Sequence, residues 1–71
     1  MIVGILLTKY DLSHIVEIKK YKKLLYSGTI ESLVCYGTLD ALSYQGILNS
    51  EIVNFKDILL KGNEFTLIRI K

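Results

Sequence analysis

The chain has 71 residues, which is enough for one small domain and too short for two. About half of the residues are hydrophobic and the net charge is +2, so charge alone does not point to a particular class of partner. Because the chain has one cysteine, Cys35, and one histidine, His14, an internal disulfide and a clustered metal site are excluded.

A core this small leaves marginal stability, and such folds often rely on a disulfide, a metal or self-association. Since the first two are excluded, we expect self-association. No stretch approaches the roughly 18 apolar residues of a membrane span. The start of the chain, "MIVGILLTKYD", lacks the charged region and cleavage site of a signal peptide. We therefore expect a cytoplasmic protein that has no cofactor and does not bind membranes.

The N-terminal segment carries apolar residues at helical spacing. Val3, Leu6, Leu7 and Tyr10 stand at positions i, i+3, i+4 and i+7, which predicts a short helix. Gly4 weakens that helix, and a strand through residues 2–7 is the alternative. For the rest of the chain the composition favours strands, because alanine occurs once while isoleucine, valine and threonine are abundant.

Residues 14–26 admit two interpretations. Two strands joined at Tyr21-Lys22-Lys23 fit the alternation on either side of the lysines, and a helix over the whole segment fits about as well. In the next apolar run Gly28 indicates a sharp bend or a close approach of two backbones. Residues 39–45 then read as a short strand or one helical turn.

The C-terminal third contains the clearest strand signal. Residues 52–60 are rich in apolar side chains, and after them Phe65 and Leu67 alternate with Thr66, Ile68 and Ile70. The polar break Lys61-Gly62-Asn63 between these runs predicts a hairpin, because glycine and asparagine tolerate positive φ. With a short helix and five strands, the sequence predicts a mostly β, compact curved barrel.

Two segments of the sequence resemble a known family. "VEIKKYKKLLYSGTIESL", with Gly28 at the bend, and "ILLKGNEFTLI" are similar to the two motifs of the Sm and Sm-like (Lsm) proteins, which include bacterial Hfq. The resemblance implies a single Sm-like domain over residues 1–71. It also implies a strongly bent, five-stranded antiparallel barrel that follows a short N-terminal helix.

The resemblance also implies a site for an RNA base. Tyr36 takes the stacking position, Thr38 and Asn63 take the polar positions, and Lys61 covers the base. Val34 and Thr38 stand where the family has Asp and Asn, and Lys61 stands where it has Arg. Since lysine lacks the planar guanidinium and threonine lacks an amide, we expect weaker or altered base selectivity. Each part of this site also has a purely structural explanation. Tyr36 would then be a half-buried aromatic residue, and Lys61-Gly62-Asn63 would only form a turn.

A cluster of lysines offers a second contact with RNA. Lys19, Lys20, Lys22 and Lys23 surround Tyr21 and could follow a phosphate backbone, although a solvated hairpin is the commoner role of such a run. No catalytic arrangement of residues is evident, so we do not expect an enzyme.

The resemblance implies a ring of six or seven copies. In that ring the strand at residues 52–60 would pair with the strand at residues 65–70 of the next copy. The sequence thus predicts a homo-oligomeric ring that binds single-stranded, U-rich RNA. The alternatives are a barrel that serves as a protein-interaction or structural module without base-specific RNA binding, and a helix-rich regulator or inhibitor.

Overall fold

A computed structural model of the chain describes residues 1–36 and 46–71. Within them it places a short helix, four strands and a π-helical segment, and residues 46–49 are also helical. The elements in chain order are α1 (Val3–Leu7), β1 (Ile15–Lys20), β2 (Lys23–Thr29), η1 (Ser32–Tyr36), β3 (Ile52–Leu60) and β4 (Asn63–Ile70). No helix in these two ranges is long and apolar enough to span a membrane.

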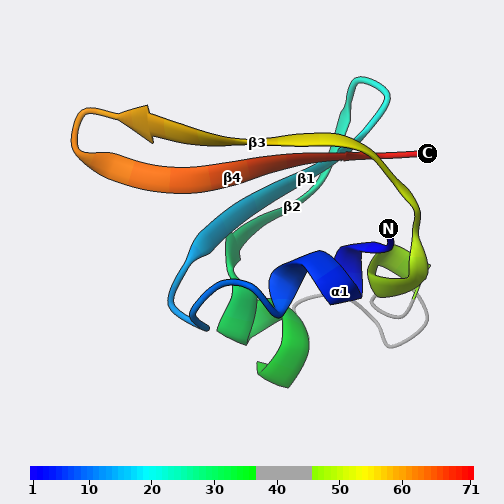
Figure 1. Cartoon of the computed structure of the whole chain (residues 1–71), viewed down its shortest axis with the longest axis horizontal. Helices are drawn as coiled ribbons and strands as arrows, with labels where there is room; N and C mark the ends of the chain where they lie inside the picture. Colours follow the sequence, from blue (N-terminus) through cyan, green and yellow to red (C-terminus); the bar gives the residue numbers. More distant parts are fainter. Residues whose placement is uncertain (37–45) are drawn as a thin grey trace.

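The four strands form one sheet in the order β2-β1-β4-β3 (Figure 1). β1 and β2 form one antiparallel hairpin, and β3 and β4 form another. The hairpins meet along β1 and β4, which run parallel from the pair Ile15–Phe65 to the pair Lys20–Ile70. The C-terminal ends of both central strands therefore lie at the same end of the molecule.

The predicted five-stranded antiparallel barrel is wrong, although the mostly β class is right. In the described ranges the sheet is open and has four strands, and its central pair is parallel. The run after Gly28 becomes helical, where Ile30 and Leu33 are buried three residues apart on one side of the helix. Alternating apolar residues specify a strand but not its partner or direction, so the pairing could not be inferred locally.

The edges of the sheet also differ from the expectation. β4 is hydrogen-bonded to strands on both sides, so residues 65–70 are not an edge that a neighbouring copy could extend. The two edge strands are β2 and β3. A ring closed through residues 65–70 is therefore not compatible with this sheet.

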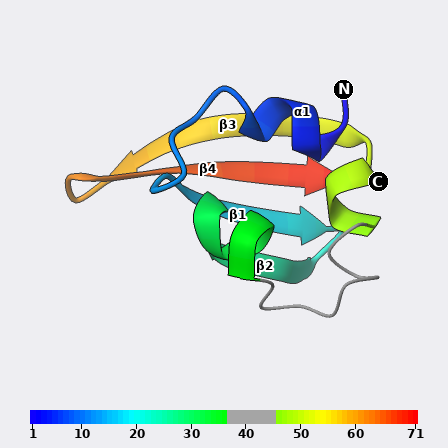
Figure 2. The same ribbon diagram turned by 90° about the horizontal axis from the view of Figure 1, so that it is seen from below.

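One face of the sheet carries the core. α1, η1 and the helical residues 46–49 all lie on that face, as the two ribbon views show (Figures 1 and 2). The predicted helical stripe is confirmed for Val3, Leu6 and Leu7, which are buried against the sheet, whereas Tyr10 lies beyond the end of α1. The other buried apolar residues are Val16, Ile18, Tyr26, Ile30, Leu33, Ile47, Ile68 and Ile70.

The other face, called the open face below, has no helix of the described chain on it (Figure 1). The strand registers place its side chains in rows that cross β1, β4 and β3. These rows are Lys19–Arg69–Asn54, Glu17–Leu67–Lys56 and Ile15–Phe65–Ile58.

Both hairpin turns contain residues with positive φ. The Lys61-Gly62 turn has φ of 52° and 81°, the pattern of a type I′ turn between the paired residues Leu60 and Asn63. Tyr21 begins the β1–β2 turn with φ of 56°. The predicted hairpin at Lys61-Gly62-Asn63 is thus confirmed. Of the two interpretations of residues 14–26, the two joined strands are right, and Lys23 of the expected Tyr21-Lys22-Lys23 turn is the first residue of β2.

Candidate functional site

The β1–β2 turn presents an aromatic ring among cations. We call residues 19–23, "KKYKK", the lysine turn; the pair Lys20–Lys23 closes it, and Tyr21 stands at its tip. Tyr21 is 81% exposed, the most exposed of the large hydrophobic residues in the described ranges. A non-glycine residue at positive φ is energetically unfavourable, so the fold holds this ring in solvent at a conformational cost.

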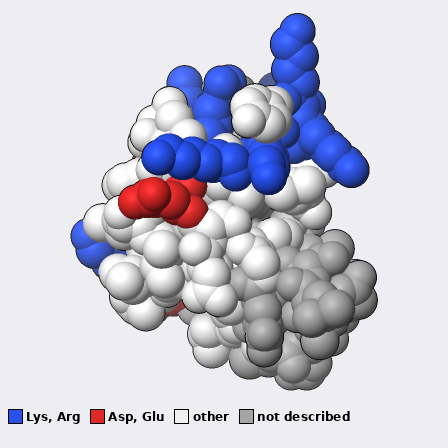
Figure 3. Space-filling model, turned by 90° about the vertical axis from the view of Figure 1, so that its right-hand side faces the viewer, with Lys and Arg blue, Asp and Glu red and all other residues white. Residues whose placement is uncertain are grey.

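Further cations lie at the same end of the molecule. The parallel register places Arg69 beside Lys19, and Lys71 follows β4 and forms an ion pair with Glu51 at 3.7 Å. Figure 3 shows Lys and Arg side chains gathered over this end. Six of the nine Lys and Arg residues of the chain belong to it: Lys19, Lys20, Lys22, Lys23, Arg69 and Lys71.

Two shallow hollows adjoin the lysine turn. One, of about 530 Å³, is lined by the turn itself and by Leu25. The other, of about 520 Å³, lies between Lys20 and Lys23 of the turn and the apolar side chains of Ile47 and Ile70. A ligand at this end would therefore meet ammonium groups and apolar surface together.

A second group of polar residues lies at the opposite end of β1. His14 Nε2 lies 2.8 Å from Thr66 Oγ1, and the Thr66 hydroxyl donates to Asp57 Oδ1 at 2.7 Å. The Tyr10 hydroxyl donates to the same carboxylate oxygen at 2.9 Å, and its ring stacks on His14 with centroids 4.4 Å apart. These four residues, called the polar cluster below, join the α1–β1 connection to β3 and β4.

Two groups of the polar cluster have shifted pKa values. The hydroxyls of Thr66 and, second, Tyr10 stabilise the Asp57 carboxylate and lower its pKa. Burial raises the pKa of Tyr10, and its hydrogen bond to Asp57 adds to that effect. Asp57 is therefore a carboxylate and Tyr10 a neutral hydroxyl donor at neutral pH.

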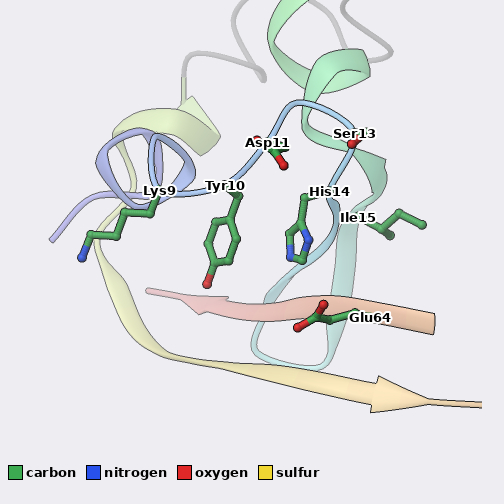
Figure 4. A pocket seen from close by; sticks show the side chains of 7 residues that line it. All are labelled: Lys9, Tyr10, Asp11, Ser13, His14, Ile15 and Glu64. Atoms are coloured by element: carbon green, nitrogen blue, oxygen red, sulfur yellow. The ribbon is translucent and has the colours of Figure 1, made fainter. Parts of the chain in front are cut away.

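A hollow of about 410 Å³ lies beside the polar cluster (Figure 4). In this view the Tyr10 and His14 rings lie side by side, and the Glu64 carboxylate comes from β4. Nowhere in the described ranges do three His, Cys, Asp or Glu residues approach closely enough to hold a metal ion. The lining residues are Lys9, Tyr10, Asp11, Ser13, His14, Ile15 and Glu64.

Three of the four residues of the predicted base site, Tyr36, Lys61 and Asn63, belong to the described part of the chain. Lys61 and Asn63 are exposed at the tip of the β3–β4 hairpin, which both ribbon views draw at one extremity of the molecule (Figures 1 and 2). Tyr36 ends η1, under the sheet, and Thr38 lies outside the described residues. The base site remains a prediction, and the barrel that was expected to assemble it is not formed.

The chain matches no family model, no curated protein and no solved structure. The resemblance to the Sm-like proteins therefore rests on the two motifs alone. The function has to be argued from the surfaces of this molecule.

Several residues of these surfaces were not identified from the sequence. Arg69 and Lys71 join the lysine turn only through the parallel pairing of β1 and β4, which the local pattern does not specify. Thr66 was placed on the same side of its strand as Ile68 and Ile70, which the structure confirms. A polar residue on that buried side was the available signal that a hydrogen-bonding partner lies opposite.

Proposed function

We propose that the protein binds single-stranded RNA through the lysine turn. The observation that carries this proposal is the Tyr21 ring, which is 81% exposed and stands at positive φ between Lys20 and Lys22. Ammonium groups contact phosphates without regard to sequence, and an exposed aromatic ring stacks on an unpaired base. A duplex hides the faces of its bases, so the ring favours a single strand over a duplex.

The distribution of charge supports the same proposal. Six cations lie at the end of the molecule that carries the turn, and the nearby Glu51 is paired with Lys71. A local concentration of cations attracts a polyanion even when the net charge of the chain is only +2. Binding should accordingly weaken as the salt concentration rises.

The test is fluorescence anisotropy with labelled oligo-U, oligo-A and a duplex of the same length at several salt concentrations. Tyr21→Ala should lower the affinity for a single strand roughly 5- to 150-fold, which corresponds to about 1–3 kcal/mol of stacking. Lys22→Ala/Lys23→Ala should reduce the slope of log K against log salt by about 1.4, because each phosphate that loses its lysine lowers the slope by roughly 0.7.

The matched control is Lys9→Ala/Lys61→Ala, which removes two exposed cations outside the lysine turn. Its affinity should stay close to that of the wild type. If this control loses affinity for oligo-U while Lys22→Ala/Lys23→Ala does not, the base site at Lys61 is supported and the lysine turn is not. No salt-sensitive binding to any oligonucleotide would favour a protein-interaction module.

A further inference from the structure

The open face begins where the lysine turn ends. Lys19 is the first residue of the turn and also the first member of the row that crosses the face through Arg69 to Asn54. The row is continuous across three neighbouring strands. A ligand bound at the turn can therefore continue onto the sheet without crossing a gap in positive charge.

A hollow of about 270 Å³ lies at the far end of this row, between β4 and β3. Three groups of different chemistry meet there, the Asn54 amide, the Lys56 ammonium and the Arg69 guanidinium. An amide donates and accepts hydrogen bonds, as the edge of a base requires, and a guanidinium binds phosphate through two parallel hydrogen bonds. Leu67, which pairs with Lys56 on the open face, supplies apolar surface in the same hollow.

The charge of the open face is complementary to a polyanion. Its rows contain three cations, Lys19, Lys56 and Arg69, and a single acidic side chain, Glu17, which is half-buried. Neither Lys56 nor Arg69 forms an ion pair with any residue of the described ranges. Their positive charge is thus available to a ligand.

The third row of the open face carries no charge. Its residues Ile15, Phe65 and Ile58 offer apolar surface.

We infer that the open face is the second half of the nucleic-acid site, and that the hollow beside Arg69 holds one nucleotide of the bound strand. This inference rests on the proposed function. The strand runs from Tyr21 over Lys19 and along the Lys19–Arg69–Asn54 row. In the hollow, Arg69 and Lys56 contact phosphate and Asn54 bonds the edge of a base.

The experiment compares single strands of two lengths, about 2 and about 12 nucleotides, by fluorescence anisotropy. Neighbouring strands lie about 4.8 Å apart, so the row from Lys19 to Asn54 spans only about 10 Å and the short strand has to be a dinucleotide if it is to cover the lysine turn alone. The long strand also reaches the hollow. Arg69→Ala and Asn54→Ala should each lower the affinity for the long strand about tenfold and leave that for the short strand within twofold. Glu17→Gln should raise the affinity for the long strand, because it removes the acid from the face.

Two control variants test whether the loss of affinity comes from lost contacts in the hollow or from any change of a surface side chain. Asn49→Ala removes an exposed amide from the helical residues 46–49, away from the open face, and should bind both strands as the wild type does. Arg69→Lys keeps the charge but loses the paired hydrogen bonds, so it should recover only part of the affinity. Unfolding midpoints in urea should agree among all variants, since the substituted side chains are not buried.

The outcomes distinguish the two proposals. If Arg69→Ala and Asn54→Ala match Asn49→Ala on the long strand while Lys22→Ala/Lys23→Ala loses affinity, the open-face site is overturned and the lysine turn stands. Equal wild-type affinities for the short and the long strand would also overturn it. If the wild type binds neither strand, both proposals fail.

Discussion

Thr66, on β4, donates its hydroxyl proton to Asp57 on β3 across 2.7 Å, although the Thr66 side chain has no exposed surface. A hydroxyl has one proton, so Thr66 can only accept at its contact with His14, and His14 Nε2 must carry a proton. The direction of donation therefore runs from His14 through Thr66 to Asp57. These two hydrogen bonds satisfy the buried Thr66 hydroxyl between the sheet and the α1–β1 connection that covers it.

Thr66→Val should destabilise the fold. The substitution keeps the shape of the side chain but leaves Asp57 and His14 without the partner that links them, and it replaces a satisfied hydroxyl on the covered side of β4. We expect the free energy of unfolding to fall by about 1–3 kcal/mol, measured by urea denaturation.

Thr8→Val is the matched control for this substitution. The Thr8 hydroxyl is exposed and bonds the carbonyl of Ile5, so its loss should change the free energy of unfolding by less than about 0.5 kcal/mol. Equal effects of the two valine substitutions would show that the Thr66 hydroxyl adds nothing to stability.

Asp57 should make the stability depend on acid pH. Hydrogen bonds from Thr66 and Tyr10 hold its pKa in the folded state below the ordinary value of 3.8. The ionised carboxylate therefore stabilises the fold at pH values above that ordinary pKa, and this contribution is lost as the pH falls through the lower, folded-state value. Asp57→Asn keeps an oxygen that accepts hydrogen bonds and removes the titration.

The measurement is the free energy of unfolding at a series of pH values from about 6 to about 2, for the wild type and Asp57→Asn. The wild type should lose more stability than the variant on acidification, because the variant cannot bind the extra proton. Parallel curves for the two proteins would show that the hydrogen bonds to Asp57 do not persist in solution.

Gly28 and Tyr26 should be energetically coupled. A Cβ at Gly28 would lie 2.9 Å from the Tyr26 hydroxyl oxygen, at a backbone φ of 155°. The same hydroxyl donates to the Thr29 carbonyl at 2.6 Å, so it cannot move away without losing that bond. We expect Gly28→Ala to cost about 1–3 kcal/mol of stability.

A double-mutant cycle separates the contact from the backbone conformation. Tyr26→Phe removes the atom that the new Cβ would meet, so Gly28→Ala should cost less in that background, with a coupling of at least about 0.5 kcal/mol. If the cost of Gly28→Ala is the same in both backgrounds, the positive φ alone accounts for the glycine.

The local parts of this fold were predictable from the sequence, and the non-local parts were not. The spacing of Val3, Leu6 and Leu7 predicted α1, and the polar break at Lys61-Gly62-Asn63 predicted the β3–β4 hairpin. The same alternation of apolar and polar residues occurs in strands with parallel neighbours and in strands with antiparallel neighbours. The pairing of β1 with β4 was therefore missed, and with it the position of Arg69 beside Lys19.

Exposure of apolar residues was the second feature that the sequence could not reveal. Residues 52–60 were expected to be an apolar edge strand covered by a neighbouring copy; β3 does lie at an edge, and within the chain Leu59 and Leu60 are 73% and 58% exposed near the tip of its hairpin. Hydrophobicity indicates which residues gain from burial, whereas the topology decides which strand is covered. His14 directly precedes β1 and is half-buried, and its hydrogen bond to Thr66 likewise depends on the pairing of β1 with β4.

Tyr21→Gly should separate stability from binding. Glycine adopts positive φ readily, so at the Tyr21 position, where φ is 56°, the substitution should leave the free energy of unfolding unchanged or raise it by up to about 1 kcal/mol. It also removes the exposed ring, so affinity for single-stranded RNA should fall at least about fivefold, as with Tyr21→Ala. Tyr21→Phe is the matched control and should keep both the stability and the affinity of the wild type. A ring that serves only the turn would give the reverse pattern, with Tyr21→Gly unstable and its binding to RNA unchanged.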